Sequence, residues 1–189
     1  MPTNPNDTRW LAGAARLALR GRPASNPNPS VGCLIVRDGR VIARGWTQAG
    51  GRPHAEAMAL DAVGSDAEGA DIYVTLESCA HESPRGPACA DRLIAARPAR
   101  VIAGMLDPDP RTAGKGIAKL RDAGIEAEVL DCHESTRSLA GYLARRHLDR
   151  PHVTLKLAMS LDGCLALADG ASQWITGEAA RAHVHSRRA

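Results

Sequence analysis

The sequence predicts an α/β sandwich, in which helices pack on the faces of a central sheet. Short apolar runs typical of buried strands alternate along the chain with segments that have the 3.6-residue period of helices. Asp38-Gly39 lies between two apolar runs and is a strong signal for a β-hairpin. The 189 residues, 44% hydrophobic and 24% charged, suffice for one good core with an appendage, but not for two ordinary domains.

The first part of the chain is expected to form a helix, a hairpin and a second helix. Asp7 or Thr8 is the expected cap of the first helix, and Gly21 is its expected end. A polar, proline-rich loop at 25–29 leads into the hairpin. The second helix follows Gly50-Gly51-Arg52-Pro53 and carries His54 at its N-terminus. The expected elements are a helix through 10–18, strands at 31–36 and 41–46, and a helix at 54–63.

The middle of the chain continues the alternation of strands and helices. The expected elements are strands at 71–76, 101–105 and 126–130, and helices from 89 to 95, 115 to 122 and 133 to 147. Asp149-Arg150-Pro151 breaks the last helix, so we divide the chain into domains at 1–148 and 149–189. Beyond the boundary we expect a strand at 152–159 and a helix at 177–188.

Composition excludes several classes of function. The net charge is only +3 and the arginines are dispersed, while aromatic residues make up 3% of the chain, so neither a basic stripe nor a stacking platform for nucleic acid is expected. No apolar run approaches the ~20 residues that cross a bilayer, and the first residues do not resemble a signal peptide. We therefore expect a cytoplasmic protein with no membrane or nucleic-acid partner. In that compartment cysteines are better metal ligands than disulfide partners.

The segment His54-Ala55-Glu56, followed by Cys79 and Cys89, contains the side chains of a catalytic zinc site. One imidazole and two thiolates hold zinc tetrahedrally and leave its fourth position for water. Zinc lowers the pKa of that water to about 7, so hydroxide becomes available at neutral pH. We expect Glu56 to transfer a proton to the leaving amine and not to act as a fourth zinc ligand. The set predicts one zinc ion per chain and hydrolytic deamination.

This element resembles the cytidine-deaminase-like zinc superfamily. The surrounding sequence segments are similar to the deaminase half of the bifunctional riboflavin-biosynthesis deaminase/reductase, and the similarity covers nearly the entire chain. These segments are 25–32, 51–56, 73–77, 105–108 and 114–117. The resemblance implies a three-layer α/β/α sandwich around a mixed sheet. It also implies a nucleotide-like substrate, a diaminopyrimidinone ribosylamino phosphate that loses its 2-amino group as ammonia.

The resemblance also implies substrate contacts. Asn28 would hold the substrate through an amide that both donates and accepts, although the same residue can simply shape its proline-bracketed turn. His81 and Arg85 are candidate phosphate contacts. Their loop departs from the family pattern, because Ser78 rather than Pro precedes Cys79, nine residues rather than eight separate the cysteines, and Glu82 adds a negative charge.

The end of the chain resembles the opening of the family's reductase domain. The positions similar to those near substrate or NADPH are Lys156, Ala158, Ser172, Trp174, Thr176 and Arg188. A reductase needs a complete sheet with a dinucleotide crevice, so we interpret 149–189 as a truncated remnant and do not expect NADPH to support turnover. A separate reductase is then a candidate partner. An unpaired strand edge in this segment would also favour a homo-oligomer or a docked tail.

Three functions remain open from the sequence. The first is the riboflavin-pathway deaminase. The second is a deaminase of a related amino-pyrimidine or purine, which the altered loop between Cys79 and Cys89 suggests. The third is a catalytically idle module that binds zinc or forms oligomers. The presence of Glu56 argues against the third, since an idle site needs no proton carrier.

Overall fold

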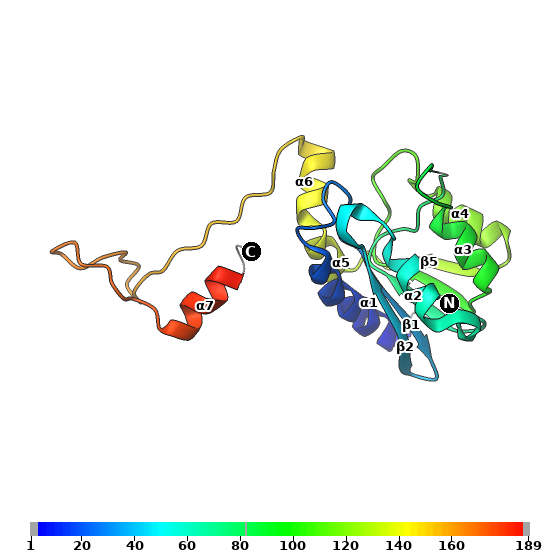
Figure 1. Cartoon of the computed structure of the whole chain (residues 1–189), viewed down its shortest axis with the longest axis horizontal. Helices are drawn as coiled ribbons and strands as arrows, with labels where there is room; N and C mark the ends of the chain where they lie inside the picture. The colour runs from blue at the N-terminus through cyan, green and yellow to red at the C-terminus, as the bar shows by residue number, and fades with distance from the viewer. Residues whose placement is uncertain (1–3, 82, 187–189) are drawn as a thin grey trace. The chain divides into compact units, whose positions relative to one another are not determined.

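The structure is a computed structural model that describes residues 4–81 and 83–186 (Figure 1). It separates into two compact units, Met1–His152 and Val153–Ala189. The first unit contains the sheet and six α-helices, and the second contains one described helix, α7 (Glu178–Ser186). No helix among the described residues is long and apolar enough to cross a membrane.

A mixed five-stranded sheet forms the centre of the first unit, in the order β2-β1-β3-β4-β5. β1 pairs antiparallel with both β2 and β3, whereas β3, β4 and β5 run parallel. The hairpin turn lies at Asp38-Gly39 as expected, and both residues have positive φ. The strands are β1 (Gly32–Arg37), β2 (Arg40–Trp46), β3 (Asp71–Val74), β4 (Arg100–Ala103) and β5 (Glu126–Val129).

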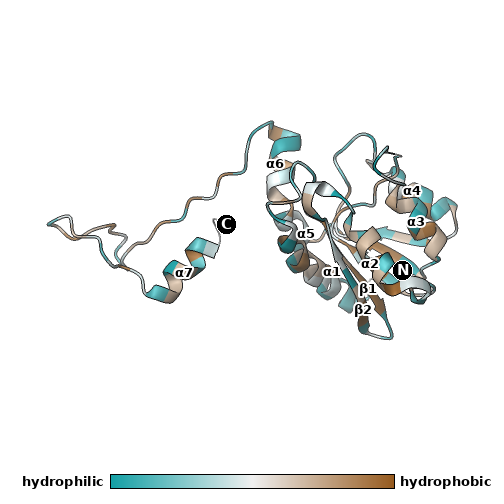
Figure 2. Ribbon diagram, in the orientation of Figure 1, coloured by the Kyte–Doolittle hydropathy of each residue, from teal (hydrophilic) through white to brown (hydrophobic). Residues whose placement is uncertain are grey.

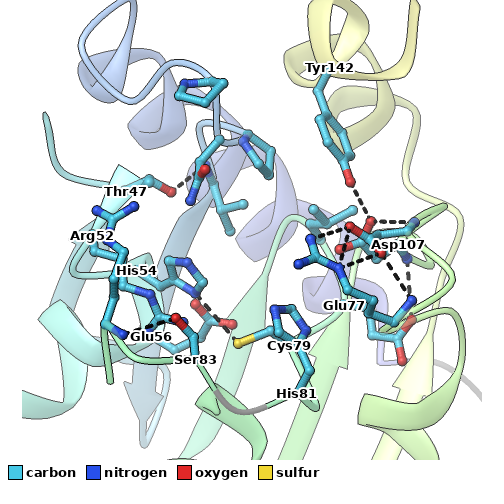
Figure 3. Close-up of a pocket in the computed structure, with 18 of the residues that line it drawn as sticks. Thr47, Arg52, His54, Glu56, Glu77, Cys79, His81, Ser83, Asp107 and Tyr142 are labelled. Carbon is cyan, nitrogen blue, oxygen red and sulfur yellow. Dashed lines mark hydrogen bonds and ion pairs between the residues drawn. The ribbon is translucent and has the colours of Figure 1, made fainter. Parts of the chain in front are cut away.

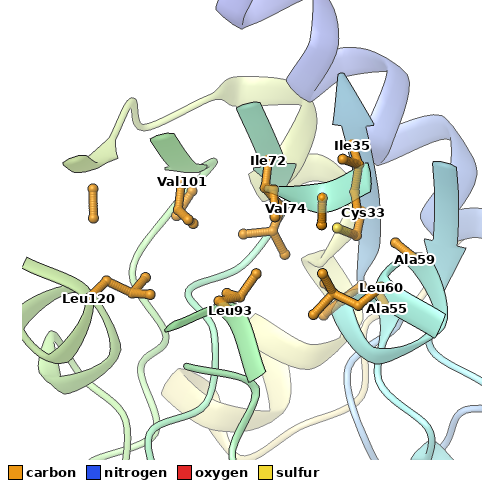
Figure 4. Close-up of a cluster of buried hydrophobic side chains, with 14 of the residues drawn as sticks. Cys33, Ile35, Ala55, Ala59, Leu60, Ile72, Val74, Leu93, Val101 and Leu120 are labelled. Carbon is orange, nitrogen blue, oxygen red and sulfur yellow. The ribbon is translucent and has the colours of Figure 1, made fainter. Parts of the chain in front are cut away.

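Helices cover both faces of this sheet, which confirms the predicted α/β sandwich. On one face α1 (Pro5–Ala18) packs over β1 and β3, with α5 (His133–Ser138) beside it. On the other face lie α2 (Ala55–Val63), α3 (Cys89–Ala96) and α4 (Lys115–Asp122). Figure 4 shows Leu60, Leu93 and Leu120 from these three helices facing the strands. Figure 2 shows apolar residues concentrated on the strands and on the helix faces that meet them.

Two glycines let the helices approach the sheet closely. A Cβ at Gly32 would lie 2.0 Å from the carbonyl oxygen of Ala14 in α1, and one at Gly45 would lie 2.0 Å from that of Ala55 in α2. Since a side chain at either position would collide with helix backbone, these contacts set the height of each helix above the strands. The contact at Gly45 positions the helix that begins next to His54.

The start of α1 differs from the prediction that Asp7 or Thr8 caps it. The helix begins at Pro5, and the Asn4 side chain caps it by accepting from the Asn6 N–H at 3.0 Å. Proline suits the first helical position because its missing N–H has no partner there in any helix. Asp7 lies instead inside the first turn, fully buried, and accepts the Tyr73 hydroxyl at 2.6 Å. Arg100 completes this network at the N-terminal ends of β3 and β4.

Two expected elements take a different form. The single helix expected at 133–147 is divided into α5 and α6 (Ala140–Leu148) at Leu139, whose side chain is buried. The strand expected at 152–159 is wrong, because these residues have no strand partner and form an irregular segment. The helix expected at 177–188 is described as α7 up to Ser186. Three short 3-10 turns, at Leu19–Gly21, Ala49–Gly51 and Gly64–Ala67, connect elements of the first unit.

Candidate zinc-dependent active site

The three predicted metal ligands come together at the C-terminal end of β3. His54 is the N-cap residue of α2, Cys79 lies in the loop after β3, and Cys89 is the first residue of α3. His54 Nδ1 lies 3.6 Å from the Cys79 sulfur and 3.3 Å from the Cys89 sulfur. The ligand atoms of all three residues lie within 4.8 Å of one another, as atoms around one ion must.

The surroundings of the two cysteines suit metal ligation. The Cys89 backbone N–H donates to the Cys79 sulfur at 3.2 Å. Hydrogen bonds from Cys89, opposed by burial and reinforced by His54, lower the pKa of Cys79 to about 4. The Cys89 sulfur at the start of α3, the Cys79 sulfur and the His54 nitrogen at the start of α2 form the mixed nitrogen and sulfur donor set that zinc prefers. The residues present therefore fit a zinc ion.

Glu56 is 3% exposed in the first turn of α2 and lines the same pocket as His54 and Cys79 (Figure 3). Burial raises the pKa of this carboxyl above its usual value, and the neighbouring His54 partly opposes the shift. The Glu56 carboxylate is not a member of the His54, Cys79 and Cys89 group. A buried carboxyl with a raised pKa beside a metal site is suited to hold and transfer a proton.

A pocket of about 430 Å³ opens in front of these residues, and Asn28, His81 and Arg85 all line it. The Asn28 side chain donates to the Gly51 carbonyl at 3.2 Å. Arg85 reaches across from the 83–87 loop and donates to the Gly50 carbonyl at 2.7 Å. His81 Nδ1 is buried without a hydrogen-bond partner among the described residues, so it is free for a ligand. Glu82, the extra charge noted in the sequence, lies outside the described residues.

The side of the pocket away from His54 was not assigned from the sequence. Glu77 follows β3 and accepts four backbone N–H groups, from Asp107, Gly114, Gly116 and Ile117, at 2.8 to 3.2 Å. One carboxylate thus fixes both the loop after β4 and the N-terminus of α4. The sequence signal was the pair of phrases at 73–77 and 114–117, which the fold joins.

The loop after β4 brings two further carboxylates to this wall. Asp107 accepts the Tyr142 hydroxyl at 2.7 Å, and Asp109 forms ion pairs with Arg111 at 2.6 Å and Arg146 at 3.6 Å. Burial raises the pKa of Asp107, whereas the hydrogen bonds from Arg111 lower that of Asp109. Tyr142 and Arg146 lie in α6, and no sequence motif identified them as residues of the site.

The positions that resemble the reductase domain lie in the second unit. Lys156, Ala158, Ser172 and Trp174 are exposed there, and Thr176 is half-buried. Lys156 donates to the carbonyl of its neighbour Leu157 at 2.8 Å, and Arg181 lies 4.3 Å from the centre of the Trp174 ring. Arg188 lies outside the described residues. The resemblance of these positions to those near substrate or NADPH in the reductase domain stays a prediction.

Comparison with known proteins matches both parts of the chain. A family model described as the cytidine and deoxycytidylate deaminase zinc-binding region matches residues 5–105, and one described as the RibD C-terminal domain matches residues 151–189. The riboflavin biosynthesis protein RibD of Escherichia coli is 47% identical over 184 residues, which are 97% of this chain and 50% of that protein. The chain spans about half the length of the curated relatives that it matches.

Solved structures give the same result. RibD of Acinetobacter baumannii is 44% identical with a TM-score of 0.77, over 95% of this chain and 50% of that one. A structure from Thermotoga maritima is 36% identical with a TM-score of 0.83, over 96% of this chain and 52% of that one. That protein is described as a diaminohydroxyphosphoribosylaminopyrimidine deaminase/5-amino-6-(5-phosphoribosylamino)uracil reductase.

Proposed function

The chain belongs to the family of the cytidine and deoxycytidylate deaminase zinc-binding region, and from this premise we propose that it is a zinc-dependent deaminase of riboflavin biosynthesis. Its proposed substrate is 2,5-diamino-6-ribosylamino-4(3H)-pyrimidinone 5′-phosphate, in line with the deaminase activity named for the T. maritima relative. The observation that carries the proposal is the His54, Cys79 and Cys89 cluster, with Glu56 buried beside it in one pocket. A volume of about 430 Å³ is in the usual range for a pocket that encloses a nucleotide-sized ligand.

The proposed reaction is a hydrolysis. Zinc held by the three ligands supplies hydroxide at neutral pH. The oxygen of water bonds to the ring carbon that bears the 2-amino group, the carbon–nitrogen bond breaks, and ammonia leaves as the ring gains a carbonyl. The Glu56 carboxylate takes the proton from water and returns it to the departing nitrogen. No electrons are exchanged, so the reaction needs no NADPH.

Three residues on the pocket wall are proposed to hold the substrate. The Asn28 amide faces the pocket from the proline-rich loop, and its bond to Gly51 fixes its orientation. His81 has an unpartnered buried nitrogen, and Arg85 supplies a positive charge at the exposed side of the pocket. A dianionic phosphate is best matched by such a cation together with an N–H donor. This arrangement favours the riboflavin intermediate over a ring without phosphate.

The proposal extends to the partners. Residues 151–189 match the RibD C-terminal domain model, so we retain 149–189 as the start of a second domain. The exposed apolar side chains of this segment are the reason to propose a homo-oligomer.

The first test is ammonia release by zinc-loaded protein from this substrate without NADPH, beside Glu56→Gln. Loss of the proton carrier should reduce turnover by about a hundredfold to ten-thousandfold. Zinc content, measured by elemental analysis, should be unchanged because Glu56 is not a ligand. Equal turnover by wild type and Glu56→Gln would refute the proposed mechanism. Turnover of cytidine or dCMP, but not of the riboflavin intermediate, would refute the proposed substrate.

A further inference from the structure

Asp107 lies on the pocket wall opposite the zinc ligands. Figure 3 shows Asp107 and Tyr142 on one side of the pocket, and His54 and Glu56 on the other. The Asp107 backbone N–H donates to Glu77 at 3.2 Å, so the loop that carries this carboxylate is anchored to the end of β3. A ligand whose reacting carbon faces Glu56 and whose phosphate lies at His81 and Arg85 would therefore bring its ribosyl group to the wall that carries Asp107.

The two oxygens of the Asp107 carboxylate have different surroundings. Oδ1 accepts the Tyr142 hydroxyl at 2.7 Å and the Asp109 backbone N–H at 2.9 Å. No hydrogen bond to Oδ2 is found among residues 4–81 and 83–186. Because the carboxylate lines the pocket and is only partly buried, this second oxygen remains able to accept a hydrogen bond from a ligand.

Tyr142 is itself held in place. It is half-buried in α6, and its side chain packs against the apolar core between the sheet and helices α2 to α4. The ring therefore delivers its hydroxyl to one fixed point, and the Asp107 carboxylate loses most of its freedom to rotate. A carboxylate that is already oriented loses less entropy when a ligand binds.

We propose that Tyr142 is a positioning residue for the deamination: it holds Oδ1 of Asp107, so that Oδ2 accepts a hydroxyl of the substrate's ribosyl group. The inference rests on the proposed function, since it assumes that the pocket binds the ribosylamino phosphate. It adds a specificity-determining contact to the ribosyl group, on the pocket wall opposite the zinc ligands. Tyr142 acts only through Asp107 and does not touch the reacting atoms.

The electrostatics of the wall agree with this role. Burial raises the pKa of Asp107, and the negative charges of Asp109 and Glu77 add to that effect. The hydrogen bonds from the Tyr142 hydroxyl and the Asp109 N–H act in the opposite direction and offset part of this rise in pKa. Arg111 and Arg146, two cations on this wall, are engaged by Asp109.

The chain offers a matched pair of variants for the test, because Tyr73 and Tyr142 are its only tyrosines. In each case the hydroxyl donates to an aspartate, and Phe removes only that hydroxyl. Tyr142→Phe should raise KM for the ribosylamino phosphate about fivefold while kcat changes little, as expected for a misplaced rather than a lost hydrogen bond. Tyr73→Phe breaks the bond to Asp7 at the far end of the strands, so it should lower stability but leave KM unchanged.

A double-mutant cycle identifies the route of the effect. Asp107→Asn should raise KM more than Tyr142→Phe does, and adding Tyr142→Phe to it should change KM no further. Additive effects, or an unchanged KM in Tyr142→Phe, would overturn the inference while wild-type turnover still supports the proposed function. Absence of ammonia release from the wild type would refute the function and the inference together. Zinc content and the thermal midpoint of each variant show that it is folded and loaded.

Discussion

At the scale of single residues, Glu77 joins the pocket to the fold through its carboxylate. It is 3% exposed, and its two oxygens together accept four backbone N–H groups. A Cβ at Gly116 would lie 2.1 Å from the Ser78 carbonyl, so the N-terminus of α4 presses directly on the segment that follows Glu77. The negative charge also lies where the α4 dipole favours an anion.

Glu77→Gln is therefore expected to destabilise the protein. The amide NH₂ would face backbone donors in place of one carboxylate oxygen, which should cost about 3 kcal/mol. Urea unfolding measures this loss in the free energy of unfolding. Glu126→Gln, on the exposed start of β5, is the control and should change stability by less than about 0.5 kcal/mol. Equal stability of the two variants would show that the four hydrogen bonds contribute little.

The residues of the site were predictable to different degrees. His54, Glu56, Cys79 and Cys89 could be grouped from the sequence because zinc chemistry restricts the ligand types, and the structure brings these residues together. Tyr142 was not found, because its contact with Asp107 spans 35 residues and depends on how α6 packs. No local spacing encodes such a contact. Glu77 was recognised only as part of a phrase, and its four bonds depend on the approach of α4.

At the scale of elements, the contact between β2 and α2 decides where His54, the first proposed zinc ligand, lies. Gly45 faces the backbone of α2, and its absent Cβ leaves room for the Ala55 carbonyl and the Ala59 N–H. Gly45→Ala should push the helix start away from the sheet and cost about 3 kcal/mol, a value typical of overpacking. Because His54 precedes this turn, the affinity for zinc should fall as well.

A chelator competition assay for zinc and a urea unfolding curve test this expectation. Gly141→Ala in α6 is the control, because a Cβ there meets no atom within 4 Å. That substitution should stabilise the protein by about 0.5 to 1 kcal/mol, since alanine favours a helix over glycine. A Gly45→Ala protein with wild-type stability and zinc affinity would show that α2 adjusts freely.

Local signals located most of the elements, and long-range contacts explain the exceptions. The hairpin turn and the bounds of α4 follow from Asp38-Gly39 and from Gly124, which depend only on nearby residues. The break at Leu139 does not, because it lies in a segment with helical periodicity and coincides with a buried side chain. The segment 152–159 has the alternation of a strand but no partner strand to pair with.

At the scale of the whole molecule, the two units differ in how far their large apolar side chains are buried. The first unit buries its apolar residues on both faces of the sheet. The second leaves alternate large apolar residues open to solvent, with Val153 and Leu155 80% and 79% exposed. The other exposed apolar residues of this row are Leu157, Met159, Leu161, Leu165 and Leu167. A row of this kind favours association with another apolar surface.

The 189-residue chain is therefore expected to self-associate through residues 153–167, in a manner that depends on concentration. Sedimentation velocity should show larger species for the full chain and a monomer for a variant that ends at His152. Ammonia release and zinc content should survive the deletion, because His54, Glu56, Cys79 and Cys89 all lie in the first unit. Leu155→Lys with Leu157→Lys should reduce association, whereas Thr154→Lys, which removes no apolar side chain, should change it much less. A full chain that remains monomeric over the same concentrations would contradict the assignment, and loss of zinc on deletion would show that the first unit depends on the second.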